Sequence, residues 1–358
     1  MKQFGRLLVV VLVVALGPRA AGAPRSTLDI YFIDVEGGQA TLVVTPTGES
    51  MLVDGGFPAD GTFASISADP HKARDANRVL AAARAAGIRR IDIELVTHFH
   101  ADHMGAVPEL AQLIPIRTFV DHGPPSEAAD AQVAGTQAAF ERYARVRAPG
   151  KHLMAKPGMK IAMAGVETVI VSSGGETIQR PLGGGGAANA ACGAAMTPAQ
   201  EPTENPRSTG FVLRFGRFRF LDLGDLSGAP LHALVCPNSL IGPVDVYLVA
   251  HHGGPDAADL ATFAGFAPRV AILNNGTAKG GSPQVLTALH QARGLEDAWQ
   301  LHRSLPAGPR FFTDEHIANL DESTAHWIKL SARTDGSFVV SNSRTGASKL
   351  YGPRPAQP

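Results

Sequence analysis

The sequence predicts an α/β protein with two strand-rich halves and residues of metal-ligand type at the ends of several strands. Short apolar runs typical of strands alternate with amphipathic segments of helical spacing. Histidine and aspartate residues follow three of the strand-like runs directly. The composition, 44% hydrophobic and 18% charged over 358 residues, is that of a globular protein with enough chain for an extensive core.

The first half begins with strands and then alternates. Short β-type runs at 28–35, 40–45 and 50–54 are separated by turns that contain glycine or proline. An amphipathic helix is expected at 74–86, followed by Gly87, and a buried strand at 91–97. Beyond it we expect a helix at 105–114, a strand at 116–121, a helix at 133–146 and a strand at 165–173.

The second half opens with an unusual segment, 174–206, which is rich in small residues and has no periodic pattern. A loop of this length is typically functional or mobile, and a disordered insertion is the alternative. Strand and helix patterns then resume. We expect strands at 209–215, 217–223 and 245–250, another starting at 269, a helix at 283–292, and closing strands at 327–332 and 337–342.

Residues 1–23 have the three parts of a secretory signal peptide: a basic start, an apolar run at 7–16 and small residues at 20–23. A membrane anchor is the alternative, but a span needs about 20 apolar residues. Signal removal leaves 29 basic and 32 acidic residues, so no general attraction to nucleic acid or anionic membrane is expected. In an oxidising compartment Cys192 and Cys236 could form a disulfide, the alternative being two free thiols.

The segment THFHADHMG, residues 97–105, concentrates potential metal ligands directly after a predicted strand. Alternation places His98 and His100 on one side, where both can reach one cation, whereas Asp102 and His103 can serve a neighbouring one. Imidazole and carboxylate groups suit zinc, with manganese or iron as alternatives. Such cations would lower the pKa of bound water toward about 7 and so supply hydroxide.

Other predicted strand ends offer the remaining ligands. Asp225 in LGD can bridge two cations, and the pair His251–His252 in AHHGG can complete the set. Asp54, also at a strand end, is expected to orient a ligand histidine from behind. The alternative for all of these histidines is an ordinary surface or core position.

These motifs resemble the metallo-β-lactamase superfamily over most of residues 24–358. The resemblance implies a four-layer αββα sandwich with its metal site at one edge of the two packed sheets. Residues 34–56, ENPRS (204–208) and AHHGG (250–254) are more narrowly similar to ComEC-type competence hydrolase domains and to secreted phosphorylcholine esterase-like relatives. The resemblance implies that His98 and His100 hold one metal, that Asp102 and His103 hold the second, and that Asp225 bridges the two. Of the two adjacent histidines, His252 is expected to be a ligand and His251 to face the substrate.

The chain departs from this resemblance at two places, and one of them concerns the first metal. Where many relatives place a further histidine, this chain has Asn205 within the segment that ends at Ser208, and asparagine is a poorer ligand. His122, after a predicted strand, is an alternative supplier, or else a residue that supports the site from the surface or from behind. The second departure is that Gly254 and Pro255 follow the histidine pair where such domains tend to have serine.

The turn NNGTAKGG, residues 274–281, can cradle an anion with Asn275, backbone amides and Lys279, the alternative being a plain solvated turn. His302 and Arg303 could approach the same edge of the sheets as the predicted metal site. Trp299 and Trp327 are expected in the core or in an interface.

The resulting prediction is a secreted binuclear metal-dependent hydrolase. Hydroxide on the metals would attack a phosphodiester or phosphorylated envelope substrate, while Asp102 orients the nucleophile or carries its proton. One alternative is a carbonyl hydrolase of the lactonase or β-lactamase type. Another is a metal-binding envelope module without catalysis.

Overall fold

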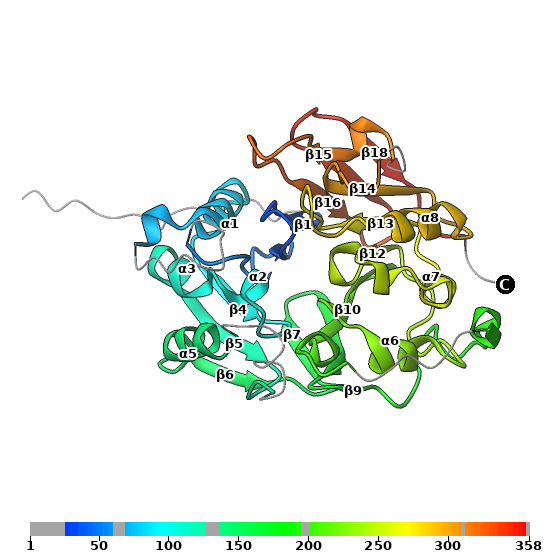
Figure 1. The fold of residues 1–358 in the computed structure, drawn as a ribbon, viewed down its shortest axis with the longest axis horizontal. Helices are drawn as coiled ribbons and strands as arrows, with labels where there is room; N and C mark the ends of the chain where they lie inside the picture. The colour runs from blue at the N-terminus through cyan, green and yellow to red at the C-terminus, as the bar shows by residue number, and fades with distance from the viewer. Residues whose placement is uncertain (1–25, 60–68, 127–135, 195–200, 309–311, 356–358) are drawn as a thin grey trace, which may run out of the picture.

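The computed structural model describes residues 26–59, 69–126, 136–194, 201–308 and 312–355. The predicted signal peptide, 1–23, and residues 133–135 of the predicted helix at 133–146 lie outside these ranges. Within them the chain forms two nine-stranded sheets (Figure 1). None of the helices in the described ranges is both long and apolar enough to cross a membrane.

The first sheet has the strand order β18-β17-β16-β1-β2-β3-β4-β5-β6. Its antiparallel part runs from β18 to β3, and β3 to β6 are parallel. The strands are β1 (Leu28–Phe32), β2 (Thr41–Val44), β3 (Ser50–Val53), β4 (Ile91–Leu95), β5 (Ile116–Asp121), β6 (Lys151–Met154), β16 (Ile328–Ala332), β17 (Phe338–Asn342) and β18 (Ser348–Tyr351).

The second sheet has the order β15-β14-β13-β12-β11-β10-β8-β7, and β9 pairs with β8. Strands β11 to β15 are parallel, so their carboxyl ends share one edge. The strands are β7 (Lys160–Met163), β8 (Val166–Ser173), β9 (Glu176–Thr177), β10 (Gly210–Phe215), β11 (Phe218–Asp222), β12 (Val246–Leu248), β13 (Val270–Leu273), β14 (Asp297–His302) and β15 (Ile317–Asn319).

Alternation along the strands divides the buried residues into layers. On β1, Ile30 and Phe32 face the second sheet, where Phe32 packs edge-on against Phe220 of β11. Tyr31 between them packs on the other side with α1. The helices are α1 (Arg74–Ala85), α2 (Ala101–Met104), α3 (Val107–Leu113) and α5 (Thr136–Arg147) on the first sheet, and α6 (Gly228–Val235), α7 (Leu260–Phe266) and α8 (Pro283–Gln291) on the second. This two-sheet architecture is consistent with the predicted metallo-β-lactamase sandwich.

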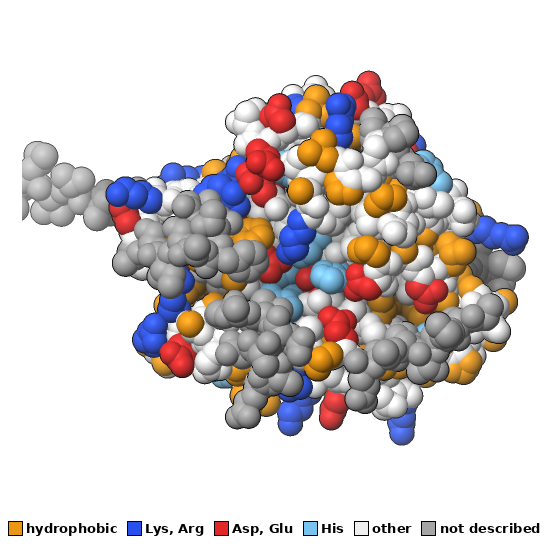
Figure 2. Space-filling model, viewed as in Figure 1, with side chains coloured by type: hydrophobic (Ala, Val, Ile, Leu, Met, Phe, Trp, Pro, Cys, Tyr) orange, Lys and Arg blue, Asp and Glu red, His pale blue; other side chains and the backbone are white. Residues whose placement is uncertain are grey.

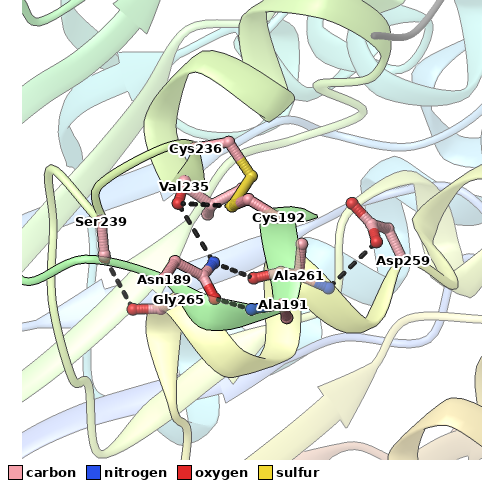
Figure 3. The surroundings of a disulfide bond; sticks show 9 residues. All are labelled: Asn189, Ala191, Cys192, Val235, Cys236, Ser239, Asp259, Ala261 and Gly265. Atoms are coloured by element: carbon pink, nitrogen blue, oxygen red, sulfur yellow. Dashed lines mark hydrogen bonds between the residues drawn. A yellow bond between two sulfur atoms is a disulfide. The ribbon is translucent and has the colours of Figure 1, made fainter. Parts of the chain in front are cut away.

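Segment 174–206 is more structured than expected. Its described parts contain β9 and two 3-10 turns, η2 (Ala190–Ala194) and η3 (Asn205–Arg207). Cys192 of η2 forms a disulfide with Cys236 after α6, with Cα atoms 5.7 Å apart, which confirms the predicted pair (Figure 3). The Asn189 amide donates to the carbonyls of Val235 and Ala261 at 3.1 and 2.8 Å. Residues near Cys192 are thereby attached to α6 and α7.

The two tryptophans occupy the expected kinds of position. Trp299 is fully buried in the core between the sheets, and its indole N–H donates to the Tyr351 hydroxyl at 3.1 Å. Trp327 is partly buried and packs edge-on against Tyr31.

Candidate metal centre

The loops that follow four strands meet at one edge of the sandwich. Asp54 follows β3 directly, and residues 97–104 follow β4 on the first sheet. Asp225 and His252 follow β11 and β12 on the second sheet. Gly224 (φ 56°) lies so close to Thr97 that a Cβ there would stand 2.7 Å from the Thr97 Cβ. Glycine at this position therefore lets the two sheet edges approach.

Four buried side chains form the tightest cluster. Candidate ligand atoms of Asp102, His103, Asp225 and His252 all lie within 4.8 Å of one another. Asp225 Oδ2 is 3.2 Å from the Nε2 atoms of both His103 and His252, and those two nitrogens are themselves 3.2 Å apart. Side chains from two sheets thus converge on one small volume, as the sequence predicts.

His98 and His100 adjoin this cluster on another side. His98 Nε2 lies 2.9 Å from His100 Nδ1 and 3.9 Å from Asp225 Oδ2. Asp225 Oδ2 therefore lies within 3.9 Å of a histidine from each of the two groups of ligand-type residues. The other Asp225 oxygen, Oδ1, is buried and has no hydrogen-bond partner among the described residues.

The electrostatics of the side chains alone favour the ligand forms of His98, Asp102 and Asp225 but not that of His103. Burial lowers the pKa of His103, but Asp225, Asp102 and Asp54 outweigh it and raise that pKa well above its usual value. Burial, with His103 and His100 close by, lowers the pKa of His98 well below its usual value, so its ring is neutral at pH 7. Burial acts to raise the pKa values of Asp102 and Asp225. Lys279 and His103 nevertheless hold the pKa of Asp102 well below its usual range, and His103 and His252 do the same for Asp225.

Asp54 supports the cluster from behind. Its Oδ2 accepts from His103 Nδ1 at 2.7 Å, so the opposite nitrogen of that ring faces Asp225. Thr97 holds the carboxylate in turn, through its backbone N–H at 2.8 Å and its hydroxyl at 2.7 Å. This is the position expected of Asp54 from the sequence, and such hydrogen bonds set the tautomer of a ligand histidine.

The structure separates the two adjacent histidines. His252 is buried with its Nε2 in the cluster, whereas the His251 side chain is 29% exposed. His251 Nδ1 lies 2.7 Å from Asp256 Oδ2, and its Nε2 lies 3.8 Å from Asp225 Oδ2. Burial lowers the pKa of His251, but Asp225 and the hydrogen bond to Asp256 outweigh it and raise the pKa to about 9.

Histidine and carboxylate side chains lie together near the centre of one face of the molecule (Figure 2). His251 is partly exposed at this centre, and its contact with a substrate stays a prediction. Its partner Asp256 has no signal in the sequence.

The structure brings His122 to Glu204 rather than to the cluster. The buried His122 Nε2 lies 2.8 Å from Glu204 Oε2, and the ring packs against Phe99. The other Glu204 oxygen accepts from the backbone N–H of Ser126 at 2.7 Å. His122 therefore holds the segment that carries Asn205. Of the two roles considered for His122, metal ligand or supporting residue, this contact corresponds to the supporting role.

Asn205 lies at the rim of the centre. Its amide nitrogen is 3.5 Å from His251 Nε2 and donates to Glu201 Oε1 at 3.2 Å. Its Oδ1 is buried without a hydrogen-bond partner among the described residues. Glu201, which also accepts from Ser227 at 2.6 Å, has no signal in the sequence. Ser208 lies further along the segment, and its carbonyl accepts from Ser172 at 2.9 Å.

The turn at 274–281 contains one residue that stabilises the fold, Asn275, and one that contacts the candidate metal centre, Lys279. The Asn275 side-chain amide donates to the His302 carbonyl at 2.8 Å. It therefore stabilises the fold and does not form the predicted anion cradle. His302 and Arg303 are engaged elsewhere, with Asp34 and Asp314, both at 2.6 Å. Lys279, by contrast, contacts the Asp102 carboxylate with its ammonium group.

Comparison with known proteins supports this architecture. Residues 33–177 match the family model of the metallo-beta-lactamase superfamily. The matched region contains Asp54 and the 98–103 cluster and ends before Asp225 and His252. Among curated proteins, no match is found. The narrower resemblance to ComEC-type and phosphorylcholine esterase-like proteins stays a prediction.

Several solved structures are similar to the chain. CmlA, a diiron beta-hydroxylase from Streptomyces venezuelae, is 14% identical with a TM-score of 0.44, over 77% of this chain and 53% of CmlA. The chain thus spans about half of CmlA. The metallo-beta-lactamase fold protein YhfI from Bacillus subtilis is 10% identical, with a TM-score of 0.45 over 77% of this chain and 96% of YhfI. MEM-A1, a subclass B3 metallo-beta-lactamase from a soil metagenome library, is 15% identical, with a TM-score of 0.38 over 68% of this chain and 86% of MEM-A1.

Proposed function

We propose that this protein is an exported binuclear metal-dependent hydrolase that acts on a phosphodiester or a phosphorylated component of the cell envelope. The convergence of ligand-type residues around Asp225 carries the proposal. Two buried carboxylates, Asp102 and Asp225, share a small volume with four histidines. Burial of carboxylates is costly even where Lys279 and histidines lie against them, and bound cations would offset that cost.

The residues present fit such cations. Imidazole nitrogens and carboxylate oxygens suit zinc, manganese or iron, and Asp225 has one buried oxygen without a partner among the described residues. When bound, two cations would supply Lewis-acid activation of water and neutralise charge that develops during ester hydrolysis.

The residues of the chain have separable tasks in this proposal. Asp54 fixes His103, so that its Nε2 stays directed into the centre. Asp102 Oδ2, which lies 3.4 Å from His103 Nε2 and 3.2 Å from His252 Nε2, would also orient the attacking water or accept its proton. His251, held by Asp256 at the exposed side, would donate a hydrogen bond to substrate.

The charge of the centre favours an anionic substrate. Two divalent cations bring four positive charges, against three negative charges from Asp102, Asp225 and the Asp54 carboxylate behind His103. A loaded centre with neutral imidazoles therefore keeps one net positive charge, which attracts a phosphodiester more strongly than a neutral lactone.

The test combines metal analysis with a substrate panel. Purified protein should contain tightly bound transition metal and hydrolyse bis(p-nitrophenyl) phosphate faster than a lactone or a β-lactam. Asp225→Ala should lose most of the metal and at least about a hundredfold in activity. Asp335→Ala, which changes a carboxylate in the β16–β17 turn, is the matched control and should keep both. A metal-loaded wild-type protein that cleaves no ester of any class would leave a binding module as the remaining function.

A further inference from the structure

Lys279 contacts the candidate metal centre with its ammonium group. Its ammonium group touches Asp102 Oδ2, the carboxylate oxygen that also faces His103 and His252. The side chain is 42% exposed, and Nζ lies 5.5 Å from the centre of the Phe57 ring. Figure 2 shows a basic side chain beside the histidines near the centre of this face. Lysine is thus available both to the centre and to a molecule outside it.

The turn that carries Lys279 is built onto a candidate ligand. The backbone N–H of Gly281 donates to the His252 carbonyl at 2.8 Å, and Gly276 N–H donates to the Lys279 carbonyl at 2.8 Å. Gly280 has φ 75°, and a Cβ there would lie 2.3 Å from the His252 carbonyl oxygen. This close approach fixes the lysine backbone relative to His252, so the ammonium group stays within reach of the centre.

The rim around His251 carries charges of both signs. Asp256 lies beside His251, whose pKa is raised to about 9, and Glu201 lies beside Asn205 and Ser227. A substrate at the centre therefore meets a paired charge at His251 and the ammonium group of Lys279. A cation at Asp102 would repel the ammonium from that oxygen, and a flexible lysine stem allows the group to turn outward.

We propose that Lys279 is a specificity-determining residue that binds an anionic oxygen of the substrate next to the scissile bond. This inference rests on the proposed hydrolase function and narrows its substrate class to esters that carry a negative charge beside the reacting atom. Neutral esters of the same shape gain nothing from the lysine.

A matched pair of substrates tests the assignment. Methyl p-nitrophenyl phosphate carries one negative charge, and dimethyl p-nitrophenyl phosphate is its neutral counterpart with the same leaving group. Lys279→Met should raise KM for the anionic diester about tenfold or more and change kcat/KM for the neutral triester less than about twofold. Lys279→Arg should restore part of the diester affinity. Lys160→Met, at a lysine on β7 that is 70% exposed, is the control and should behave as wild type.

The outcomes separate this inference from the proposed function. Equal losses on both substrates, an unchanged KM for the diester, or loss of metal from Lys279→Met would overturn the assignment. Calorimetric binding of inorganic phosphate to the metal-loaded protein gives a readout that needs no turnover, and Lys279→Met should weaken it about tenfold. If Lys279→Met weakens phosphate binding while wild-type protein cleaves no ester, the hydrolase proposal is wrong. The assignment of Lys279 to anion binding is then still supported.

Discussion

The disulfide between Cys192 and Cys236 permits a quantitative prediction. The perturbation is the double variant Cys192→Ser/Cys236→Ser, which leaves no unpaired thiol behind. A separation of 44 residues corresponds to about 4 kcal/mol of stabilisation in the chain-entropy model. Measured values for native disulfides are commonly about 2–4 kcal/mol, so we expect a loss of about 3 kcal/mol.

This loss should be visible in both chemical and thermal unfolding. With an unfolding entropy of about 2.1 cal/mol/K per residue, 3 kcal/mol lowers the Tm of a 358-residue chain by about 4 °C. Reductant should lower the Tm of wild-type protein to the value of the variant and leave the variant unchanged. Metal content should not change, because the disulfide joins η2 to the residue that follows α6, and neither of these elements carries a candidate ligand.

Two results would refute the reasoning. If the variant and the wild type have the same Tm with and without reductant, the bond does not constrain the unfolded chain as calculated. If the variant keeps its stability but loses metal, segment 183–194 supports the centre in a way that its contacts with α6 and α7 do not explain.

Three further predictions concern groups at and behind the centre. Asp54→Asn should weaken metal affinity about 10–100-fold, measured by competition with a chromophoric chelator, because His103 loses the carboxylate that orients it. Burial raises the pKa of Asp222 to about 7 despite the hydrogen bond from Gly224. Its proton therefore stabilises the fold below about pH 4, and this stabilisation is lost as the pH rises through 7. Asp222→Asn should then gain stability relative to wild type by up to about 4 kcal/mol between pH 4 and pH 8 in urea unfolding. Chelation of metal should lower the Tm, since Asp102 and Asp225 lose their counter-charges, and added zinc should restore it.

Features with a local physical signature could be predicted from the sequence. The apolar strand 91–95 followed by H-x-H-x-D-H indicated both β4 and the candidate ligands, because strand alternation and ligand chemistry act over a few residues. The same holds for Asp225 after β11 and for the histidine pair after β12. Because ligand-type residues follow β4, β11 and β12, the loops after these strands are expected to lie close together.

Features that depend on tertiary contacts could not be predicted. β6 is an edge strand with mostly exposed residues, so Lys151–Met154 lacks the apolar alternation that marks a strand. Glu201 and Asp256 act through partners that only the fold brings near, and Glu204 meets His122 across 82 positions. No spacing rule in one sequence identifies such pairs.

Backbone conformation at the centre explains how the adjacent His251 and His252 come to occupy different positions. Both residues have positive φ values, 50° and 53°, which are unfavourable for a residue with a Cβ. Asp54, with φ 60°, shares this feature. The His252 carbonyl accepts from Gly281, and the two consecutive left-handed residues turn one ring inward and leave the other at the rim. Such conformations persist where surrounding contacts hold them, and they concentrate at functional sites. Backbone strain at Asp54, His251 and His252 therefore indicates that these strand ends serve a functional site and not stability alone. This argument does not depend on the residues being potential metal ligands.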